Sequence, residues 1–351
     1  MSASPRSLPF PCTQFPTLAH HRPAPCIQLH VHCYRNDASA SPVFIHPQPN
    51  THTQPYFFTH TAVFFTPRLS AAQEPWSLMY LEGRDSLPIN VSPQLTFKDD
   101  PVPAKNEQAT RAASLVSASV AFFRTLRDEK LKPDIYHRKP SRSQTGMYEK
   151  VLSRTPAPLA WFVSFALFQA FPLDMSQYGH LFRSSRIPQR GMDFLRQYPD
   201  TRHVIVQRGP DFFPVTVLRE DGTAAPPEEI LGSFRAILAT PLRAEAPPVG
   251  VLTAMDRDSW ADARDALQAS DPINAATLEE IESALFAVCL EHDTCGPPAN
   301  TPVEALTEAQ VLEQARVMLH GDARNRWFDK VCVCVCACVS VCVRVCVRVF
   351  L

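Results

Sequence analysis

Hydrophobic and polar positions divide this chain of 351 residues into three zones. Residues 1–70 keep no helical or strand period and are rich in proline and histidine, whereas periodic apolar patterns run through residues 74–330. After Lys330, valine and cysteine alternate almost to the end of the chain. The pattern therefore predicts a disordered start, one folded zone and a low-complexity tail over residues 331–351.

Apolar residues at helical spacing predict several helices in the folded zone. The most regular helix opens at Asn106, and its last turns collect basic residues, which the helix dipole favours at that end. Further helices are expected from Pro227, over residues 258–269 and 278–283, and from a Thr307/Gln310 capping box to Gly321.

Two β-rich runs, His203–Gln207 and Phe212–Leu218, flank a Gly-Pro-Asp turn and predict a hairpin. Pro214 lies in the second run, and because proline cannot donate to a strand ladder, we expect that strand at a sheet edge. Shorter strands are expected over residues 249–253 and 284–290. This alternation of helices and strands predicts an α/β fold with a mixed sheet and flanking helices.

The Val/Cys alternation of the tail is the pattern of a strand with a cysteine face and a valine face. Such a run favours aggregation, and a translated GTGTGT repeat would produce it, so we expect the tail to be dispensable for folding. A metal–thiolate cluster is the alternative. Tetrahedral sites usually take their ligands from several loops, so no metal site is predicted.

An aromatic and aliphatic run, residues 159–171, is the segment whose composition alone points most directly to a function. It is too short to span a bilayer, which takes about 20 apolar residues. Periodicity cannot assign so short a run, so it fits either a buried helix or an interfacial segment whose basic flanks meet anionic headgroups. The residues that would contact the membrane are Leu159, Trp161, Phe162, Phe165 and Phe168, with Lys150 and Arg154.

Composition narrows the choice of partners. The formal net charge is −1, so no global field recruits nucleic acid. Histidines concentrate in residues 1–70 without the fixed spacing that a metal site needs. The same residues make a poor mitochondrial presequence, because they contain few arginines and no evident amphipathic helix.

A segment of residues 171–188 carries the most specific motif of the chain. Pro172 ends the apolar run, and we expect a helix after it that Asp174 or Ser176 caps. Its Leu-Asp-Met-Ser-Gln-Tyr sequence and later Arg-Ile-Pro turn resemble a signature of the choline/carnitine acyltransferase family, and residues 325–330, Asn-Arg-Trp-Phe-Asp-Lys, resemble the opening of a second one. The motif residues are Asp174, Ser176, Gln177, Tyr178, Arg326, Trp327 and Asp329.

This resemblance, which covers residues 74–330, implies a fold and an activity. Family members transfer an acyl group between coenzyme A and the hydroxyl of carnitine, on an α/β architecture related to chloramphenicol acetyltransferase, and need no other cofactor. Here that fold would be truncated before its second half. Long-chain mitochondrial members carry a membrane-associating insert before the first signature, which corresponds to residues 150–173. The resemblance thus implies acyl-CoA and carnitine as substrates, inner-membrane lipids as partners, and a peripheral position on the matrix side of the mitochondrial inner membrane.

In the family, a histidine downstream of the second signature acts as general base toward the hydroxyl or thiol. The Val/Cys tail stands in its place here, so the catalytic residue is unknown and we expect the chain to be inactive as it stands. The alternative hypothesis is a non-catalytic, membrane-associated isoform or fragment. The histidines that remain in or near the folded zone, none of them in a His-Ser-Trp context, are His137, His180, His203, His292 and His320.

Overall fold

A computed structural model describes most of the folded zone and part of the tail. The expected disordered start lies outside the described residues, as do Asp174, His292 and His320. The described residues are 77–90, 95–96, 100–173, 175–243, 245–291, 305–319, 321, 323–335 and 343–346.

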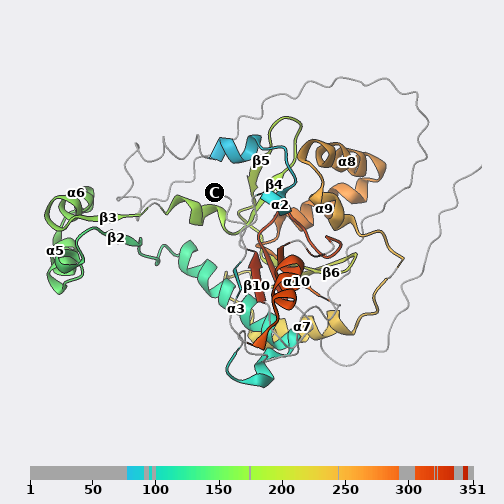
Figure 1. Ribbon diagram of the computed structural model, residues 1–351, viewed down its shortest axis with the longest axis horizontal. Coiled ribbons are helices and arrows are strands. Elements are labelled where there is room, and N and C mark those ends of the chain that lie inside the picture. The colour runs from blue at the N-terminus through green and yellow to red at the C-terminus, as the bar shows by residue number, and fades with distance from the viewer. Residues whose placement is uncertain are drawn as a thin grey trace, which may run out of the picture.

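A mixed sheet of six strands forms the centre of the described fold (Figure 1). The strand order is β1-β10-β9-β8-β6-β7, in which β8 lies parallel to both β6 and β9 while the other neighbours are antiparallel. The expected mixed α/β class is therefore confirmed. The strands of this sheet are β1 (Leu95–Thr96), β6 (His203–Arg208), β7 (Asp211–Thr216), β8 (Ala287–Leu290), β9 (Cys332–Val335) and β10 (Val343–Cys346).

Helices cover both faces of the sheet, because successive side chains of a strand point to opposite sides. Val204 and Val206 of β6 pack in one core with the long helix α3, whereas Ile205 between them packs in a second core with α8 and α9. The helices of the body are α2 (Leu87–Asn90), α3 (Gln108–Arg127), α7 (Pro227–Ala239), α8 (Arg257–Ser270), α9 (Pro272–Ser283) and α10 (Glu308–Leu319), with the 3₁₀ helices η2 (Pro103–Asn106), η3 (Ser176–His180) and η4 (Val249–Ala254).

Most predicted elements are confirmed. The hairpin turns at Gly209, whose φ of 58° suits glycine, and β7 with Pro214 is the edge strand. Thr307 Oγ1 accepts from the N–H of Gln310 at 3.3 Å while the Gln310 side chain accepts from the N–H of Thr307 at 2.9 Å, which is the predicted capping box.

Two local predictions were wrong. Residues 249–253 form the 3₁₀ helix η4 rather than a strand, and Gly250 lies so close to its neighbours that an added Cβ would stand 2.4 Å from the carbonyl oxygen of Arg326. The segment after Pro172 forms only the short 3₁₀ helix η3 instead of an α-helix. A small hairpin of β4 (Ser184–Ile187) and β5 (Phe194–Gln197) follows it.

Residues 134–173 form an arm that projects from the body (Figure 1). Two short strands pair at its base, and helices α5 and α6 lie at its outer end. The arm has its own small core of Tyr148, Phe168 and Ala170, in which the Tyr148 hydroxyl lies 3.1 Å from Ser164 Oγ. Its elements are β2 (Ile135–His137), α4 (Pro140–Ser143), α5 (Gly146–Arg154), α6 (Ala157–Phe168) and β3 (Ala170–Pro172).

The first residues of the tail belong to the sheet, which contradicts the expectation that the tail is dispensable. Strand β9 lies between β8 and β10, and its register pairs Val333 with Val288. Val331, Val333 and Val335 are buried in the core that contains α3. The physical reason is that a period of two places every second residue, here each valine from 331 to 335, on the covered face of the sheet.

Candidate functional site

The two segments that carry motif residues meet the start of α8 at one buried position, which we call the junction. Arg186 comes from β4, Arg257 opens α8, and Asp329 lies in the turn before β9. All three side chains are buried, although charged residues are rarely buried unless they are paired.

Asp193 balances the cations of the junction. Its carboxylate accepts from Arg186 Nε at 2.6 Å and from Arg257 Nε at 2.6 Å, and Arg84 Nη2 lies 2.5 Å away. Arg186 also donates to the carbonyl of Tyr80 at 2.8 Å. Burial lowers the pKa of Arg186, and the carboxylate of Asp193 opposes that shift. Asp193 therefore connects β4, α8 and the helix formed by residues 77–82.

Asp329 fixes the second signature to the start of α8. It accepts from Arg257 Nη1 at 2.6 Å and from Trp260 Nε1 at 2.6 Å. The indole of Trp327 lies edge-on to Trp260 at 6.0 Å and to Phe212 at 5.6 Å, so aromatic contacts complete the same packing.

Lys330 lies beneath the junction, fully buried. Its Nζ donates to the carbonyl of Glu282 at 2.7 Å, to the carbonyl of Ser184 at 3.0 Å and to Ser185 Oγ at 3.1 Å. Burial lowers the pKa of this amine to about 7. Because every donor of the amine has an acceptor, we assign Lys330 a structural role.

Glu282 extends the network with its carboxylate. Arg264 Nη2 donates to it at 2.7 Å and the Tyr198 hydroxyl at 3.1 Å. Burial raises the pKa of Glu282 despite Arg264, and burial together with Glu282 raises the pKa of Tyr198. These groups pair with one another and leave no carboxylate oriented toward a substrate.

Among the described residues, no histidine of the body has the surroundings of a general base. His180 Nδ1 lies 3.1 Å from Gln197 Nε2, and burial lowers its pKa. His203 Nε2 lies 2.9 Å from the carbonyl oxygen of Glu280. Neither imidazole is paired with both a nucleophile and an orienting carboxylate, which base catalysis would require.

The structure separates the residues of the two signatures. Arg326 forms a buried ion pair with Glu291, and Trp327 and Asp329 lie in the junction. Tyr178 packs edge-on against Phe122 at 6.2 Å, while Gln177 is exposed. Of the remaining predicted residues, Asp174 and the side chain of Ser176 lie outside the described part.

The aromatic run lies on the arm, and the structure exposes most of it. Trp161 is 41% exposed and Phe162 53%, and Leu159 and Phe165 are exposed as well. Phe168 differs, since it is only 7% exposed and packs against Tyr148 at 5.1 Å, so it supports the arm instead of reaching a membrane. No helix in the described ranges is long and apolar enough to cross a bilayer.

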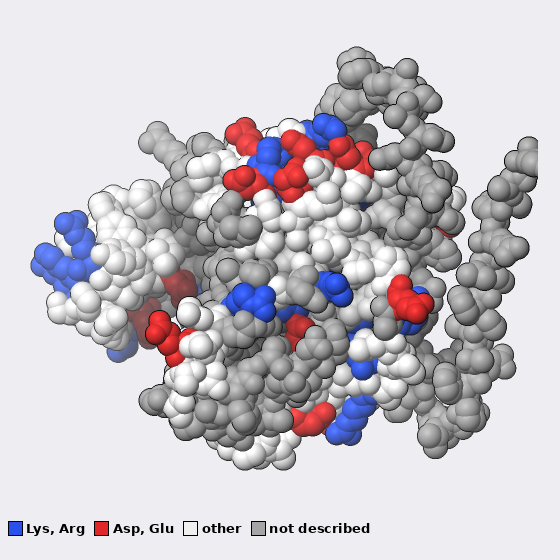
Figure 2. Space-filling model, turned by 45° about the vertical axis from the view of Figure 1, so that its right-hand side comes forward, with Lys and Arg blue, Asp and Glu red and all other residues white. Residues whose placement is uncertain are grey.

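The arm that carries the aromatic run also carries exposed basic side chains. Figure 2 shows them gathered at its outer end among uncharged residues. The arm contains five basic residues and two acidic ones, Asp134 and Glu149, although the whole chain has a net charge of −1. The basic residues, all exposed, are Arg138, Lys139, Arg142, Lys150 and Arg154.

Two important residues of the junction, Asp193 and Glu282, were missed by the sequence analysis. Asp193 follows Met192 in a polar stretch that has no motif, and its partner Arg257 is 64 positions away. Its role as the shared carboxylate of the junction becomes visible only in the fold, where three guanidinium groups approach it. A search of the described residues finds no group of His, Cys, Asp or Glu that could hold a metal ion.

Comparison with known proteins relates these segments to one family. Residues 70–344 match the choline/carnitine O-acyltransferase family. Over 256 residues the chain is 36% identical to mitochondrial carnitine O-palmitoyltransferase 2 of Homo sapiens and 37% to that of Mus musculus, an overlap that covers 73% of this chain and 36% of each relative. The muscle isoform of carnitine O-palmitoyltransferase 1 of Bos taurus is 29% identical over 260 residues, 72% of this chain and 28% of that protein. The chain therefore spans little more than a third of the length of these carnitine O-palmitoyltransferase 2 relatives, and it belongs to the choline/carnitine acyltransferase family.

Proposed function

We propose that this chain provides the N-terminal scaffold of a carnitine O-acyltransferase that moves long-chain acyl groups between coenzyme A and carnitine in mitochondria. The observation that carries the proposal is the junction, where Asp193 and Arg257 connect Arg186 of the first signature to Asp329 of the second through buried contacts. Buried charges are costly unless they are paired, and this pairing holds the two signatures in a fixed relative position, as a scaffold requires.

We infer further that the scaffold alone does not catalyse the transfer. A positioned base contributes typically about 10²–10⁴-fold to such a reaction. The described histidines of the body, His180 and His203, are bound to structural partners instead.

Carnitine-dependent release of coenzyme A from palmitoyl-CoA tests this inference on the purified chain. We expect no release above a buffer control. Turnover that disappears in His180→Gln or in His203→Gln alone would identify a base in this chain and would contradict the inference. A transcript that encodes a His-Ser-Trp segment beyond Lys330 would support the scaffold of a complete enzyme.

The second candidate is a non-catalytic isoform that attaches to the mitochondrial inner membrane, peripherally and from the matrix side. The exposed Trp161 and Phe162, which are large apolar side chains next to basic residues, favour membrane attachment in either case. Transcripts that all encode the Val/Cys tail, together with vesicle binding and no turnover, would favour this candidate over the enzyme.

A further inference from the structure

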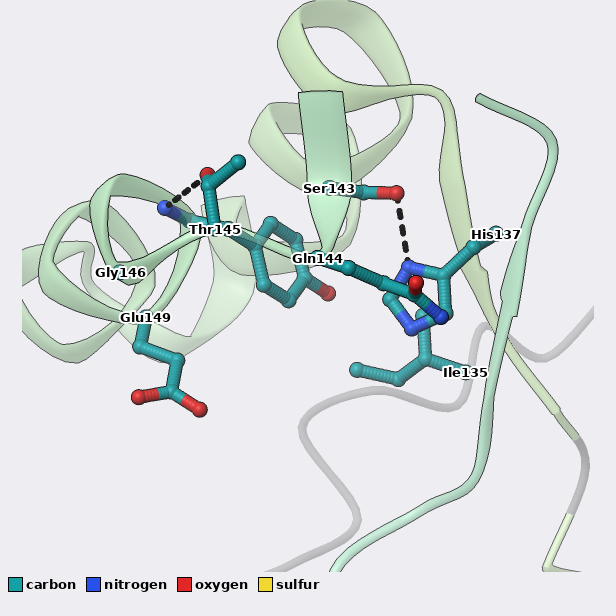
Figure 3. A pocket seen from close by; sticks show the side chains of 8 residues that line it. Ile135, His137, Ser143, Gln144, Thr145, Gly146 and Glu149 are labelled. Atoms are coloured by element: carbon teal, nitrogen blue, oxygen red, sulfur yellow. Dashed lines mark hydrogen bonds between the residues drawn. The ribbon is translucent and has the colours of Figure 1, made fainter. Parts of the chain in front are cut away.

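A hollow of about 430 Å³ lies in the arm, next to the helices that carry the aromatic face. Figure 3 shows its walls, which come from β2 on one side and from the beginning of α5 on the other. The residues that line it are Ile135, His137, Ser143, Gln144, Thr145, Gly146, Tyr148 and Glu149.

The walls of the hollow combine hydrogen-bonding groups with an apolar floor. Ser143 Oγ donates to the carbonyl of Lys139 at 3.1 Å and lies 2.7 Å from His137 Nδ1, which holds the imidazole ring in place. The amide of Gln144 supplies two donors, and an imidazole that takes up a proton donates from both nitrogens. The rings of His137 and Tyr148 meet edge-on at 6.0 Å.

Three basic residues are direct sequence neighbours of residues that line this hollow, although none of the three lines it. Arg138 and Lys139 directly follow His137 in the chain, and Arg142 directly precedes Ser143. Within the described ranges, none of these three cations forms an ion pair. Glu149 is the one carboxylate in the lining. Such an excess of exposed cations is complementary to an anion.

The exposed apolar face of α6 favours one class of anion as the ligand. A soluble phosphate would use the cations but would leave Trp161 and Phe162 in water. A second copy of the chain would bring another basic arm to the same place, and like charges repel. A phospholipid offers an anionic group and acyl chains in one molecule, and therefore matches both surfaces.

We propose that the hollow lined by His137, Gln144 and Gly146 holds the phosphate-bearing headgroup of an anionic phospholipid while the exposed face of α6 lies against the acyl chains. This proposal rests on the membrane attachment proposed above and adds a binding site to it. The arm then recognises a headgroup, whereas a purely apolar arm would bind zwitterionic and anionic membranes alike.

The test uses the full chain with vesicles of phosphatidylcholine, prepared with and without cardiolipin. Gly146 is suited to substitution, because a Cβ there meets nothing within 4 Å and a carboxylate in the first turn of a helix is compatible with its dipole. Gly146→Asp places a negative charge at the hollow, and Gly146→Asn is the uncharged control of the same size. Ser153→Asp adds the same charge to α5 at a residue that does not line the hollow.

We expect Gly146→Asp to weaken binding to cardiolipin vesicles at least fivefold, the effect of about one surface charge, and Gly146→Asn to leave it unchanged. The loss should persist at high salt, where screening removes the smaller effect of Ser153→Asp. Glu149→Gln, which removes the carboxylate from the lining, should tighten binding by a similar factor.

Four outcomes would overturn the proposal. Equal effects of Gly146→Asp and Ser153→Asp at every salt concentration would show diffuse attraction without a site. Equal binding of the parent chain to both vesicle types would show that the headgroup is not recognised, although membrane attachment itself would stand. Binding of soluble glycerol phosphate that Gly146→Asp weakens, while the same variant leaves binding to cardiolipin vesicles unchanged, would assign the hollow to a soluble anion. A chain that binds neither vesicle type would refute the membrane attachment itself.

Discussion

The junction and the arm differ in which side chains they bury and which they expose to solvent. The junction buries charged side chains such as Asp193 and Arg257 and joins them in ion pairs, although Nη2 of Arg257 is left without a hydrogen-bond partner among the described residues. The arm instead exposes aromatic side chains such as Trp161 and Phe162. Buried charge is tolerated only with partners, and exposed aromatic surface is unfavourable unless something covers it. The difference indicates that motif residues such as Trp327 and Asp329 stabilise the body, and it is consistent with our proposal that the arm binds a partner.

The largest effect is expected when the pairing of the junction is broken. Asp193→Asn keeps the shape of the side chain but leaves the guanidinium groups of Arg186 and Arg257 without their shared carboxylate. We expect a loss of about 3–5 kcal/mol in the free energy of unfolding, measured by urea denaturation. The control is Asp262→Asn on α8, which breaks an exposed ion pair with Arg190 and should change the free energy of unfolding little. Equal losses in both variants would show that the junction is no more than a surface network.

A smaller effect is expected at the start of the tail. Val333→Ala removes two methyl groups from the core that contains α3, and we expect a loss of about 2 kcal/mol. Val311→Ala, at an exposed valine of α10, is the control and should be neutral. If a chain stopped at Lys330 melts at the same temperature as the parent, β9 does not contribute to the sheet.

The third effect is a pH dependence from Lys330, which is small over any single pH unit. The pKa of this amine is lowered to about 7 in the folded chain and returns to its ordinary value near 10.5 on unfolding. Between these values the unfolded state binds more protons, so the parent should gain stability as the pH rises from 7 to 9, by up to about 1.4 kcal/mol per pH unit. Lys330→Met should lack this slope. Parallel stability curves for the two proteins would show that Lys330 stays charged in the fold.

Local patterns in the sequence predicted the regular elements well. The apolar periodicity after Asn106 predicted α3, although the helix begins at Gln108, because Glu107 caps it and the Asn106 side chain bonds to Asp100 instead. Residues 249–253 were assigned wrongly, because five apolar or small residues fit a strand and a 3₁₀ turn equally well.

The candidate sites were less predictable, because they depend on contacts between distant residues. No spacing rule joins Asp193 to Arg257, or Lys330 to Ser185, 145 positions earlier. Likewise the aromatic run fitted a buried or an interfacial helix, and only its position on a separate arm shows that Phe168 is buried while Phe162 is exposed. The family resemblance thus identified the two signature segments, whereas only the fold shows which of their residues contact one another.

The membrane role of the arm is tested most directly by co-sedimentation of the full chain with cardiolipin-containing vesicles. Apolar burial stabilises by roughly 25 cal/mol per Å², so Trp161→Ala with Phe165→Ala should abolish most binding at low and at high salt. Both side chains are exposed, so the melting temperature should hardly change. If the double variant binds as well as the parent but melts at a much lower temperature, α6 is a core helix and the arm does not bind membranes.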